Sequence, residues 1–450
     1  MEPKGFVQLR IIIIGAGIAG FASAVMLRNA GHKVKIIEKS NFTREAGFGI
    51  SIAPNASKIL DTINFDFSKA SAVPCEAIVV RDPKTLETRI DYRLEDQFEK
   101  WGGAWYLILR PDIHNELKRL ALIDDGRSPT PELILGAKVV DVDIERGTVA
   151  LNDGTEYSAD LIIGADGEQV PYPGLLLISF FPSDVLIARK SQVQKQVSTT
   201  PSRLRESTVG IFRNIIPTRD ILADPVTNKV YQSRKNTFCM FIDESGKSSL
   251  TWFECRDGTL QDIEATYLLH KPDGSRKVFD EAKLKEQMLH EFRNFHPDLL
   301  QALKKATTIT NWTINFAQPL SNWTKAKGVI LGDAAHSMFP TTGQGGCQSI
   351  EDAGALGVLL SELPDVNQLS ERLKLFEQVR RGRASTMQAM SSTFFGAENR
   401  VHPKMYKYLP GGGPFSSFER YQDFSNAYDV IAESRKVLDA TRRKKTKARL

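Results

Sequence analysis

The chain opens with a hydrophobic run, Leu9-Arg10-Ile11-Ile12-Ile13-Ile14, in which only Arg10 is polar. A helical pattern of apolar residues follows over residues 18–30, and Gly31 marks its end. A second apolar run then ends at Glu38. Strand and helix patterns continue to alternate to about residue 60, which predicts parallel strands joined by helices.

Beyond residue 60 the pattern changes to the period-two alternation of β-strands. It is clearest over residues 77–92 and 237–254, where no helical pattern intervenes. This change predicts a β-rich segment inserted into the chain. The remaining predicted elements are a hairpin at Asp153-Gly154 between 148–151 and 155–157, buried strands at 161–163 and 329–331, and a long helix over 345–363.

A glycine motif, Gly15-Ala16-Gly17-Ile18-Ala19-Gly20, joins the first strand to the first helix, and Glu38 stands 21 residues after Gly17. Gly15 allows a tight turn, Gly17 lets the backbone approach a pyrophosphate, and Gly20 lets the helix pack on the strand. The helix N-terminus then faces the phosphates, and Glu38 can accept hydrogen bonds from a ribose. The pattern predicts a dinucleotide-binding βαβ unit, with a chance glycine turn as the alternative.

Together these patterns predict an α/β fold: a Rossmann-like dinucleotide-binding domain, interrupted by a β-rich substrate domain and followed by a helical C-terminal region. The predicted order is residues 8–75, 110–169 and 323–365 for the dinucleotide-binding domain, 76–109 and 205–322 for the substrate domain, 170–190 for a non-native insertion, 366–440 for the helical region and 441–450 for a basic tail.

Charge is concentrated at the C-terminus. The chain of 450 residues has a net charge of +5, and six positive charges lie within residues 442–449. Without those six the net charge would be −1. The body is therefore nearly neutral, which argues against a broad nucleic-acid surface.

Cysteine and hydropathy patterns bear on location. The four cysteines show no paired spacing and are interpreted as reduced thiols of an intracellular, cytoplasmic protein. No apolar run of about 20 residues predicts a stable membrane span. Ala448-Arg449-Leu450 resembles the C-terminal Ser-Lys-Leu peroxisomal address, which gives peroxisomes as the alternative. No metal site is predicted, because the spacing of six between His290 and His296 suits neither a helix face nor a hairpin.

Four motifs follow one another over most of residues 8–365. They are Gly15–Gly20 with Glu38; Arg110-Pro111-Asp112-Ile113-His114; Gly164-Ala165-Asp166-Gly167; and Gly332-Asp333-Ala334-Ala335-His336 with Gly343-Gln344-Gly345-Gly346. In this order they resemble the group A flavoprotein monooxygenases, which have the para-hydroxybenzoate-hydroxylase fold and include salicylate-hydroxylase-like and fungal secondary-metabolite enzymes. The resemblance implies non-covalent FAD, NAD(P)H as reductant and O2 as co-substrate.

The resemblance implies roles for particular residues. Asp333 should accept hydrogen bonds from the ribityl hydroxyls. The helix near Gly345 and Gly346 should direct its N-terminus at the flavin pyrimidine ring. Arg110 should lie along the FAD phosphates or the ring edge, unless it is simply a surface arginine at a helix start. The stretch from Glu38 to Gly49 should wrap the adenosine half and the flavin face.

In this family, reduced FAD adds O2 to form a C4a-hydroperoxide, which attacks an electron-rich carbon in a dry pocket. Arg213 resembles the pocket arginine of fungal phenol hydroxylases and is the predicted catalytic residue, with a structural arginine on an edge strand as the alternative. Those enzymes often carry a tyrosine about 30 residues later. Phe241 or Ile242 holds that place here, so the resemblance does not extend to an Arg/Tyr pair.

The third motif also departs from the family pattern, which usually continues as GADG-x-x-S-x-x-R. Removing residues 170–190 restores the serine as Ser191 and places Gln194 where arginine is common. The removed piece corresponds to 63 nucleotides; it begins with a valine, whose codons start with GT, and ends with a lysine, for which one codon ends in AG. A retained intron or mis-annotated exon is the favoured interpretation, and a genuine hydrophobic insertion is the alternative.

The predicted function is an FAD-dependent monooxygenase that uses NAD(P)H and O2. The expected substrate is a small aromatic or polyketide- or terpenoid-like metabolite, which the enzyme hydroxylates or epoxidises. The alternatives are an FAD oxidoreductase that does not oxygenate and an inactive splice product that binds FAD.

Overall fold

The computed structural model describes residues 6–42, 47–126, 128–167, 191–198, 204–246, 248–271, 273–393 and 400–447. Two sequence-based predictions concern residues outside these ranges. They are the proposed insertion at 170–190 and the C-terminal address Ala448-Arg449-Leu450.

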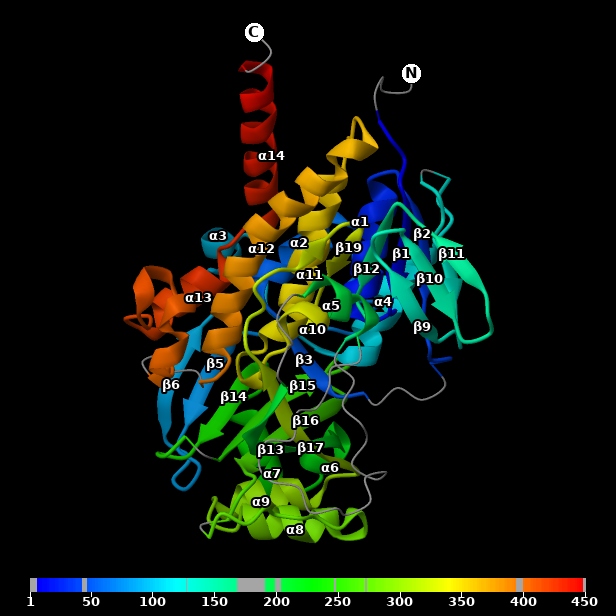
Figure 1. Ribbon diagram of the computed structural model, residues 1–450. Coiled ribbons are helices and arrows are strands. Elements are labelled where there is room, and N and C mark those ends of the chain that lie inside the picture. The colour runs from blue at the N-terminus through cyan, green and yellow to red at the C-terminus, as the bar shows by residue number, and fades with distance from the viewer. Residues whose placement is uncertain are drawn as a thin grey trace.

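A six-stranded sheet forms the centre of the first domain (Figure 1), in the order β18-β19-β12-β1-β2-β8. All neighbouring strands are parallel except β18 and β19. The apolar run predicted as the first strand is β1, whose four isoleucines are buried. The strands are β1 (Arg10–Ile14), β2 (Lys33–Ile37), β8 (Glu132–Ile134), β12 (Leu161–Gly164), β18 (Thr324–Lys325) and β19 (Gly328–Ile330).

Helix α11 is the central helix of this domain and matches the long helix predicted near residue 345. It packs against α1, α2, α12 and α14, and α1 in turn packs against α4. The predicted α/β architecture is therefore correct. These helices are α1 (Ile18–Asn29), α2 (Pro54–Thr62), α4 (Arg110–Leu122), α11 (Gln344–Leu360), α12 (Leu369–Met390) and α14 (Val430–Lys447).

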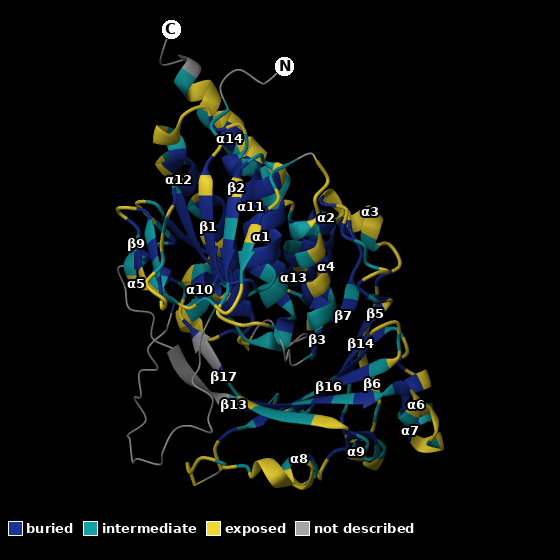
Figure 2. Cartoon of the chain, turned by 90° about the vertical axis from the view of Figure 1, so that its right-hand side faces the viewer, coloured by how far each residue is buried: buried dark blue, intermediate teal, exposed yellow. Residues whose placement is uncertain are grey.

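A seven-stranded sheet lies below the first domain in Figure 2, in the order β17-β13-β16-β15-β14-β5-β6. One face packs on α6 to α9 in a second core that contains Phe212, Trp252 and Phe292, and the other face turns toward the first domain. The members are β5 (Ala77–Arg81), β6 (Thr88–Arg93), β13 (Leu204–Pro217), β14 (Thr237–Ile242), β15 (Ser249–Cys255), β16 (Leu260–Leu268), β17 (Thr308–Ala317), α6 (Thr218–Leu222), α7 (Pro225–Gln232), α8 (Leu284–Glu291) and α9 (Pro297–Lys304).

The other described strands form two small sheets, in the orders β11-β10-β9 and β3-β7-β4. The hairpin predicted at Asp153-Gly154 is present, with Val149 opposite Tyr157. Strand β7, which ends at the predicted boundary of residue 109, pairs with β3 and β4 and not with the seven-stranded sheet. The remaining elements are β3 (Gly49–Ile52), β4 (Val73–Pro74), β7 (Tyr106–Leu109), β9 (Val139–Asp143), β10 (Thr148–Leu151), β11 (Glu156–Ser158), α3 (Gln97–Trp101), α5 (Gln192–Val197), α10 (Asp333–His336) and α13 (Phe418–Asn426), with short 3-10 turns at 281–283, 340–342, 366–368, 403–408 and 410–412.

The basic residues predicted to form a separate tail instead continue helix α14 as far as Lys447. Ion pairs hold this end of the helix, because Arg442 contacts Glu362 at 3.0 Å and Lys445 contacts Glu371. In Figure 1, α14 lies at the opposite end of the molecule from α8 and α9. Within the described ranges, every helix is too short or too polar to cross a membrane.

The residues that flank the proposed insertion are held close together. Gln192 donates its backbone N–H to Asp166 Oδ2 at 3.1 Å, and α5 packs against β9, β12 and β19. A link of two residues can span such a gap, since each extended residue covers about 3.3–3.6 Å. The closure from Gly167 to Ser191 therefore does not require a longer connection.

We expect deletion of residues 170–190 to give protein with equal or better solubility and flavin loading, because α5 has its own described contacts with β9, β12 and β19. Soluble yield and the flavin-to-protein absorbance ratio measure the result. Deletion of residues 174–194 is the matched control: it removes the same number of residues but takes away Ser191, which caps α5, and Gln194, which binds Ala334 O at 2.5 Å. Transcripts that all contain the segment, together with a 170–190 deletion that fails to fold, would contradict the prediction.

Candidate cofactor and substrate site

The glycine turn between β1 and α1 leaves one open position. Gly15 has φ +100°, and a Cβ there would lie 2.3 Å from Ala165 O. A Cβ on Gly20 would lie 2.0 Å from Gly15 O. By contrast, no described atom lies within 4 Å of a Cβ built on Gly17. Gly15 and Gly20 thus allow close packing, and Gly17 leaves space beside the start of α1 for a phosphate.

Glu38 ties the end of β2 to this turn. Its Oε2 accepts the backbone N–H of Ala16 at 2.8 Å, and its Oε1 accepts that of Ser40 at 2.8 Å. Each carboxylate oxygen can accept a second hydrogen bond. The geometry is compatible with the predicted ribose contact and adds a structural role that the sequence did not reveal.

The Gly332-Asp333 motif lies at the end of β19, where Gly332 has φ +57° and Asp333 begins α10. Asp333 is exposed. Asp352 on α11 holds this loop from behind, since its Oδ2 accepts Gly332 N–H at 2.9 Å and contacts His336 Nε2 at 2.7 Å. His336 is therefore a buried residue that fixes the loop, and Asp333 is the member of the motif that remains available to a ligand.

The N-terminus of α11 is open in the same region. Gly343, with φ +63°, precedes a helix of 17 residues. A Cβ on Gly346 would lie 3.8 Å from Ile50 Cδ1, and one on Gly345 would lie 4.0 Å from Met338 Cγ. Both glycines are partly exposed. The unpaired N–H groups and the positive end of the helix dipole favour a ligand that carries negative charge at this position.

Two buried acidic residues of α11, Glu351 and Asp352, were missed in the sequence. Arg380 of α12 donates through Nε to Asp352 Oδ1 at 2.9 Å and through Nη1 to Glu351, and all three side chains are fully buried. Burial raises the pKa of Glu351, but the charges of Arg383 and Arg380 outweigh that effect and hold it below its usual value. The sequence did contain a signal for this buried ion pair, since two adjacent acidic residues interrupt a helix pattern that is otherwise apolar.

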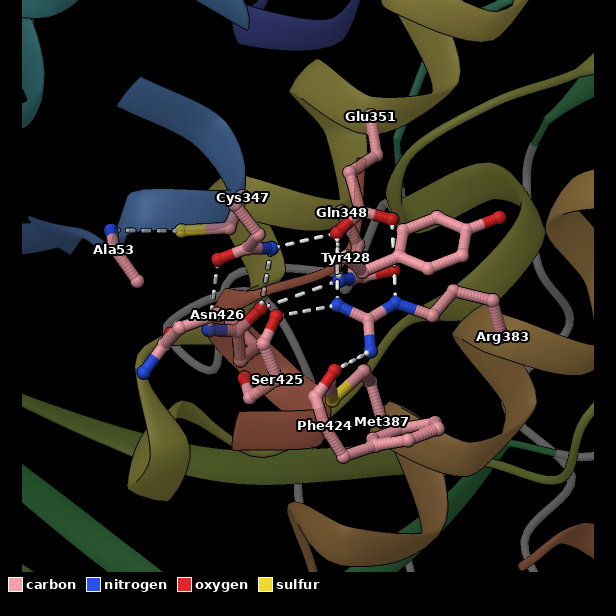
Figure 3. A network of polar contacts seen from close by, with 12 residues as sticks. Ala53, Cys347, Gln348, Glu351, Arg383, Met387, Phe424, Ser425, Asn426 and Tyr428 are labelled. Atoms are coloured by element: carbon pink, nitrogen blue, oxygen red, sulfur yellow. Dashed lines mark hydrogen bonds and ion pairs between the residues drawn. The ribbon is translucent and has the colours of Figure 1, made fainter. Parts of the chain in front are cut away.

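Figure 3 shows how Arg383 extends this network to the C-terminal region. Its Nη2 binds Glu351 Oε1 at 3.0 Å and Ser425 O at 2.6 Å, and its Nη1 binds Phe424 O at 2.7 Å. The guanidinium also lies over the ring of Tyr428, 4.6 Å from its centroid. Helices α11, α12 and α13 are thus joined through one buried ion-pair network behind the open end of α11.

Arg110 and Gly49 occupy neighbouring positions. Arg110 is the exposed first residue of α4, and its backbone N–H binds Phe48 O at 2.9 Å. Gly49 packs closely against the seven-stranded sheet, because a Cβ there would lie 2.3 Å from Phe253 Cε2. Gly49 therefore brings the first domain into contact with the sheet and does not leave open space as Gly17 does.

Arg213 contacts the same backbone from the sheet. Its Nη2 binds Gly49 O at 2.7 Å and also Glu264, which is its direct cross-strand partner on β16. The side chains of Arg213 and Glu264 are 20% and 13% exposed. Arg213 thus lies beside Gly49 at the start of β3. The next residue of that strand, Ile50, lies close to Gly346 at the open end of α11.

Phe241 and Ile242 stand where related hydroxylases often carry a tyrosine, and both are apolar. The nearby Tyr231 of α7 lies in the second core, on the face of the sheet away from the first domain. Tyr231 donates its hydroxyl to Glu254 at 2.6 Å, and Phe241 lies in the second core with α6 to α9. Ile242 lies on the face toward the first domain. Of the predicted binding residues, the open Gly17, the exposed Asp333 and the α11 glycines share one region, with Arg213 beside it. In the described ranges, no group of three or more His, Cys, Asp or Glu side chains is placed to hold a metal.

The glycine turn, Glu38 and the open end of α11 define a protein built to bind a dinucleotide. The comparisons agree: a family model described as an FAD binding domain matches residues 140–391, and one described as pyridine nucleotide-disulphide oxidoreductase matches residues 9–181. The chain is 30% identical over 406 residues to the FAD-dependent monooxygenase phomE' of Diaporthe leptostromiformis. The aligned residues cover 90% of this chain and 96% of that relative. This chain therefore belongs to the FAD-dependent monooxygenase family.

Other relatives and solved structures extend the comparison. Hispidin-3-hydroxylase of Neonothopanus nambi is 29% identical, covering 98% of this chain and 99% of its own. The salicylate hydroxylase substrate complex has a TM-score of 0.68 at 22% identity, covering 96% and 98% of the two chains. CtdE in complex with FAD and substrate 4 has a TM-score of 0.71 at 19% identity, covering 96% and 98%. The solved structures show that the fold is shared. Membership of the family makes the chain an FAD-dependent oxidoreductase, and NAD(P)H is the reductant typical of that family.

The residues present fit FAD. The open space at Gly17 suits a pyrophosphate, and Asp333 and the N-terminus of α11 suit the ribityl chain and the ring. When bound, FAD supplies the exchange of electrons between NAD(P)H and O2. The protein supplies the glycine turn, the exposed carboxylate and the helix end that would hold it.

Proposed function

We propose that the enzyme hydroxylates or epoxidises a small aromatic or polyketide- or terpenoid-like metabolite at the expense of NAD(P)H and O2. The observation that carries this proposal is the position of Arg213, which reaches from the seven-stranded sheet to Gly49 beside the open end of α11. The similarity to hispidin-3-hydroxylase over nearly the whole chain supports hydroxylation as the reaction.

The proposed role of the sheet face is to orient the substrate and to exclude water. Arg213 is fixed by two partners, Gly49 O and Glu264, so its guanidinium has a defined direction. Phe48 supports it, with its ring centroid 5.0 Å from the guanidinium carbon. A fixed cationic group can position a substrate hydroxyl, and apolar walls limit side reactions.

Incubation of the FAD-loaded enzyme with NADH or NADPH, 18O-labelled O2 and a panel of phenolic metabolites tests the proposal. We expect one labelled oxygen atom in the product, detected by mass spectrometry, and reductant consumption coupled to product. Reductant consumption that yields only hydrogen peroxide across the panel would support the non-oxygenating alternative.

We expect Arg213→Ala to lower kcat/KM by about tenfold or more while most of the FAD is retained, because the variant removes one directional group from the substrate side. Arg213→Lys should recover little, since Nη2 of the longer, planar guanidinium makes both contacts, with Gly49 O and with Glu264, and an ammonium on a different stem does not keep that geometry. Steady-state rates and flavin content measure both effects. Arg219→Ala is the control, because Arg219 is 86% exposed on α6. Unchanged turnover in Arg213→Ala would make the residue purely structural.

A further inference from the structure

The wall of the proposed substrate site that Arg213 occupies carries two carboxylates as well. Asp262 and Glu264 stand two residues apart on β16, so both side chains point to the same face of the sheet as Arg213. The neighbours that flank the group on this face, with described side chains, include the uncharged Ile211, Thr251 and Thr266. With both acids ionised, this group of three has a net charge of −1.

Each member of the group has defined contacts. Glu264 pairs directly with Arg213, and Asp262 Oδ2 accepts the backbone N–H of Gly49 at 2.5 Å. Asp262 is fully buried, and its Oδ1 has no hydrogen-bond partner among the described residues. Burial raises the pKa of both carboxyl groups above their usual values, while the Arg213 charge acts in the opposite direction. The positive charge of Arg213 is thus already matched before any ligand binds.

Resting on the proposed function, we infer that the Arg213–Glu264–Asp262 group selects a neutral, hydroxyl-bearing substrate and rejects aromatic carboxylates. A carboxylate ligand would have to compete with Glu264 for Arg213 and would leave buried acids without their cation. A neutral hydroxyl, in contrast, can donate a hydrogen bond to a carboxylate oxygen without displacing the ion pair. Glu264 is therefore a specificity-determining residue, and Arg213 is not a free anion-binding group.

Three probes with the same ring test this inference: 3-hydroxybenzyl alcohol, 3-hydroxybenzoate and 3-hydroxybenzylamine. Their dissociation constants are measured on the FAD-loaded, oxidised enzyme from changes in flavin absorbance. We expect the wild-type enzyme to bind the alcohol about tenfold or more tightly than the carboxylate, because like charges at a buried contact disfavour the wrong partner.

Glu264→Gln keeps the shape of the side chain and removes its charge. We expect the alcohol-to-carboxylate preference to fall by about tenfold or more in this variant, because Arg213 loses its direct ion-pair partner and the net charge of the group rises from −1 to 0. Arg213→Gln provides a second variant with the opposite expectation, a gain in affinity for the amine. Glu254→Gln is the matched control: Glu254 is a buried carboxylate of β15 that binds Tyr231 and Asn236, so the variant changes net charge equally without altering Arg213.

A wild-type enzyme that binds the carboxylate as tightly as the alcohol would overturn the inference. An unchanged preference in both Glu264→Gln and Arg213→Gln, the same shift in Glu254→Gln, or no change in the flavin spectrum with any probe would also overturn it. Oxygen incorporation is measured separately with labelled O2. A charge-dependent preference without oxygenation would therefore refute the proposed function and leave this inference standing.

Discussion

Replacing Asp333 by alanine is expected to remove most of the bound FAD. Asp333 is the exposed acidic residue at the end of β19, and by resemblance it accepts two hydrogen bonds from the ribityl chain. Hydrogen bonds to a charged acceptor are worth about 1.5–3 kcal/mol each. The loss of two corresponds to a fall in FAD affinity of about a hundredfold to ten-thousandfold. The absorbance of purified protein and titration of the apoprotein with FAD measure the effect.

Asp439→Ala is the control for this experiment, because Asp439 is an exposed aspartate on α14. It should retain wild-type flavin content. The unfolding temperature of both apoproteins should change little, since neither substitution removes a buried group. Full flavin retention in Asp333→Ala would show that the ribityl contact is made by another residue.

Replacing Arg380 by methionine is expected to destabilise the fold by about 3–5 kcal/mol, because it leaves buried acids without their cation. The variant removes the contacts of Arg380 with Glu351, with Asp352 and with Gln348 Oε1 at 2.8 Å. Since Asp352 also holds Gly332 and His336, flavin content should fall together with stability. Denaturant unfolding followed by circular dichroism, soluble yield and flavin content are the measurements.

Arg381→Met provides a matched control one residue away. Arg381 is 46% exposed and forms a surface ion pair with Glu377, at 3.3 Å. Surface pairs of this kind contribute about 0–1 kcal/mol, so this variant should resemble the wild type. Equal stability of the Arg380 and Arg381 variants would mean that the buried network does not support the flavin site.

The Arg213–Glu264 pair changes how the predicted catalytic arginine should be understood. The resemblance to fungal phenol hydroxylases gave Arg213 only the role of a pocket arginine. The structure gives that cation a carboxylate partner before substrate arrives. The charge of the substrate, and not only its shape, therefore becomes the property that the proposed probe series measures.

The sequence by itself determined the βαβ unit and the nucleotide motif. Periodicity and glycine preferences act over one strand or one helical turn, so β1, α1 and the open position at Gly17 follow from neighbouring residues. The hairpin at Asp153-Gly154 was predicted for the same reason. The order of the four motifs also sufficed for the family and for FAD.

Only the tertiary structure decided which distant residues became partners. Strand β7 has a local pattern that suits either sheet, and packing against β3 settled its place. Glu264 is 51 residues from Arg213, and Asp262 is 213 residues from Gly49. Glu351 and Arg380 lie on different helices and form a buried ion pair. A buried charge is costly unless it is paired, and only the packing of the two helices determines which residue becomes its partner. The sequence therefore located the cofactor motifs, whereas folding determined the charge of the wall beside them.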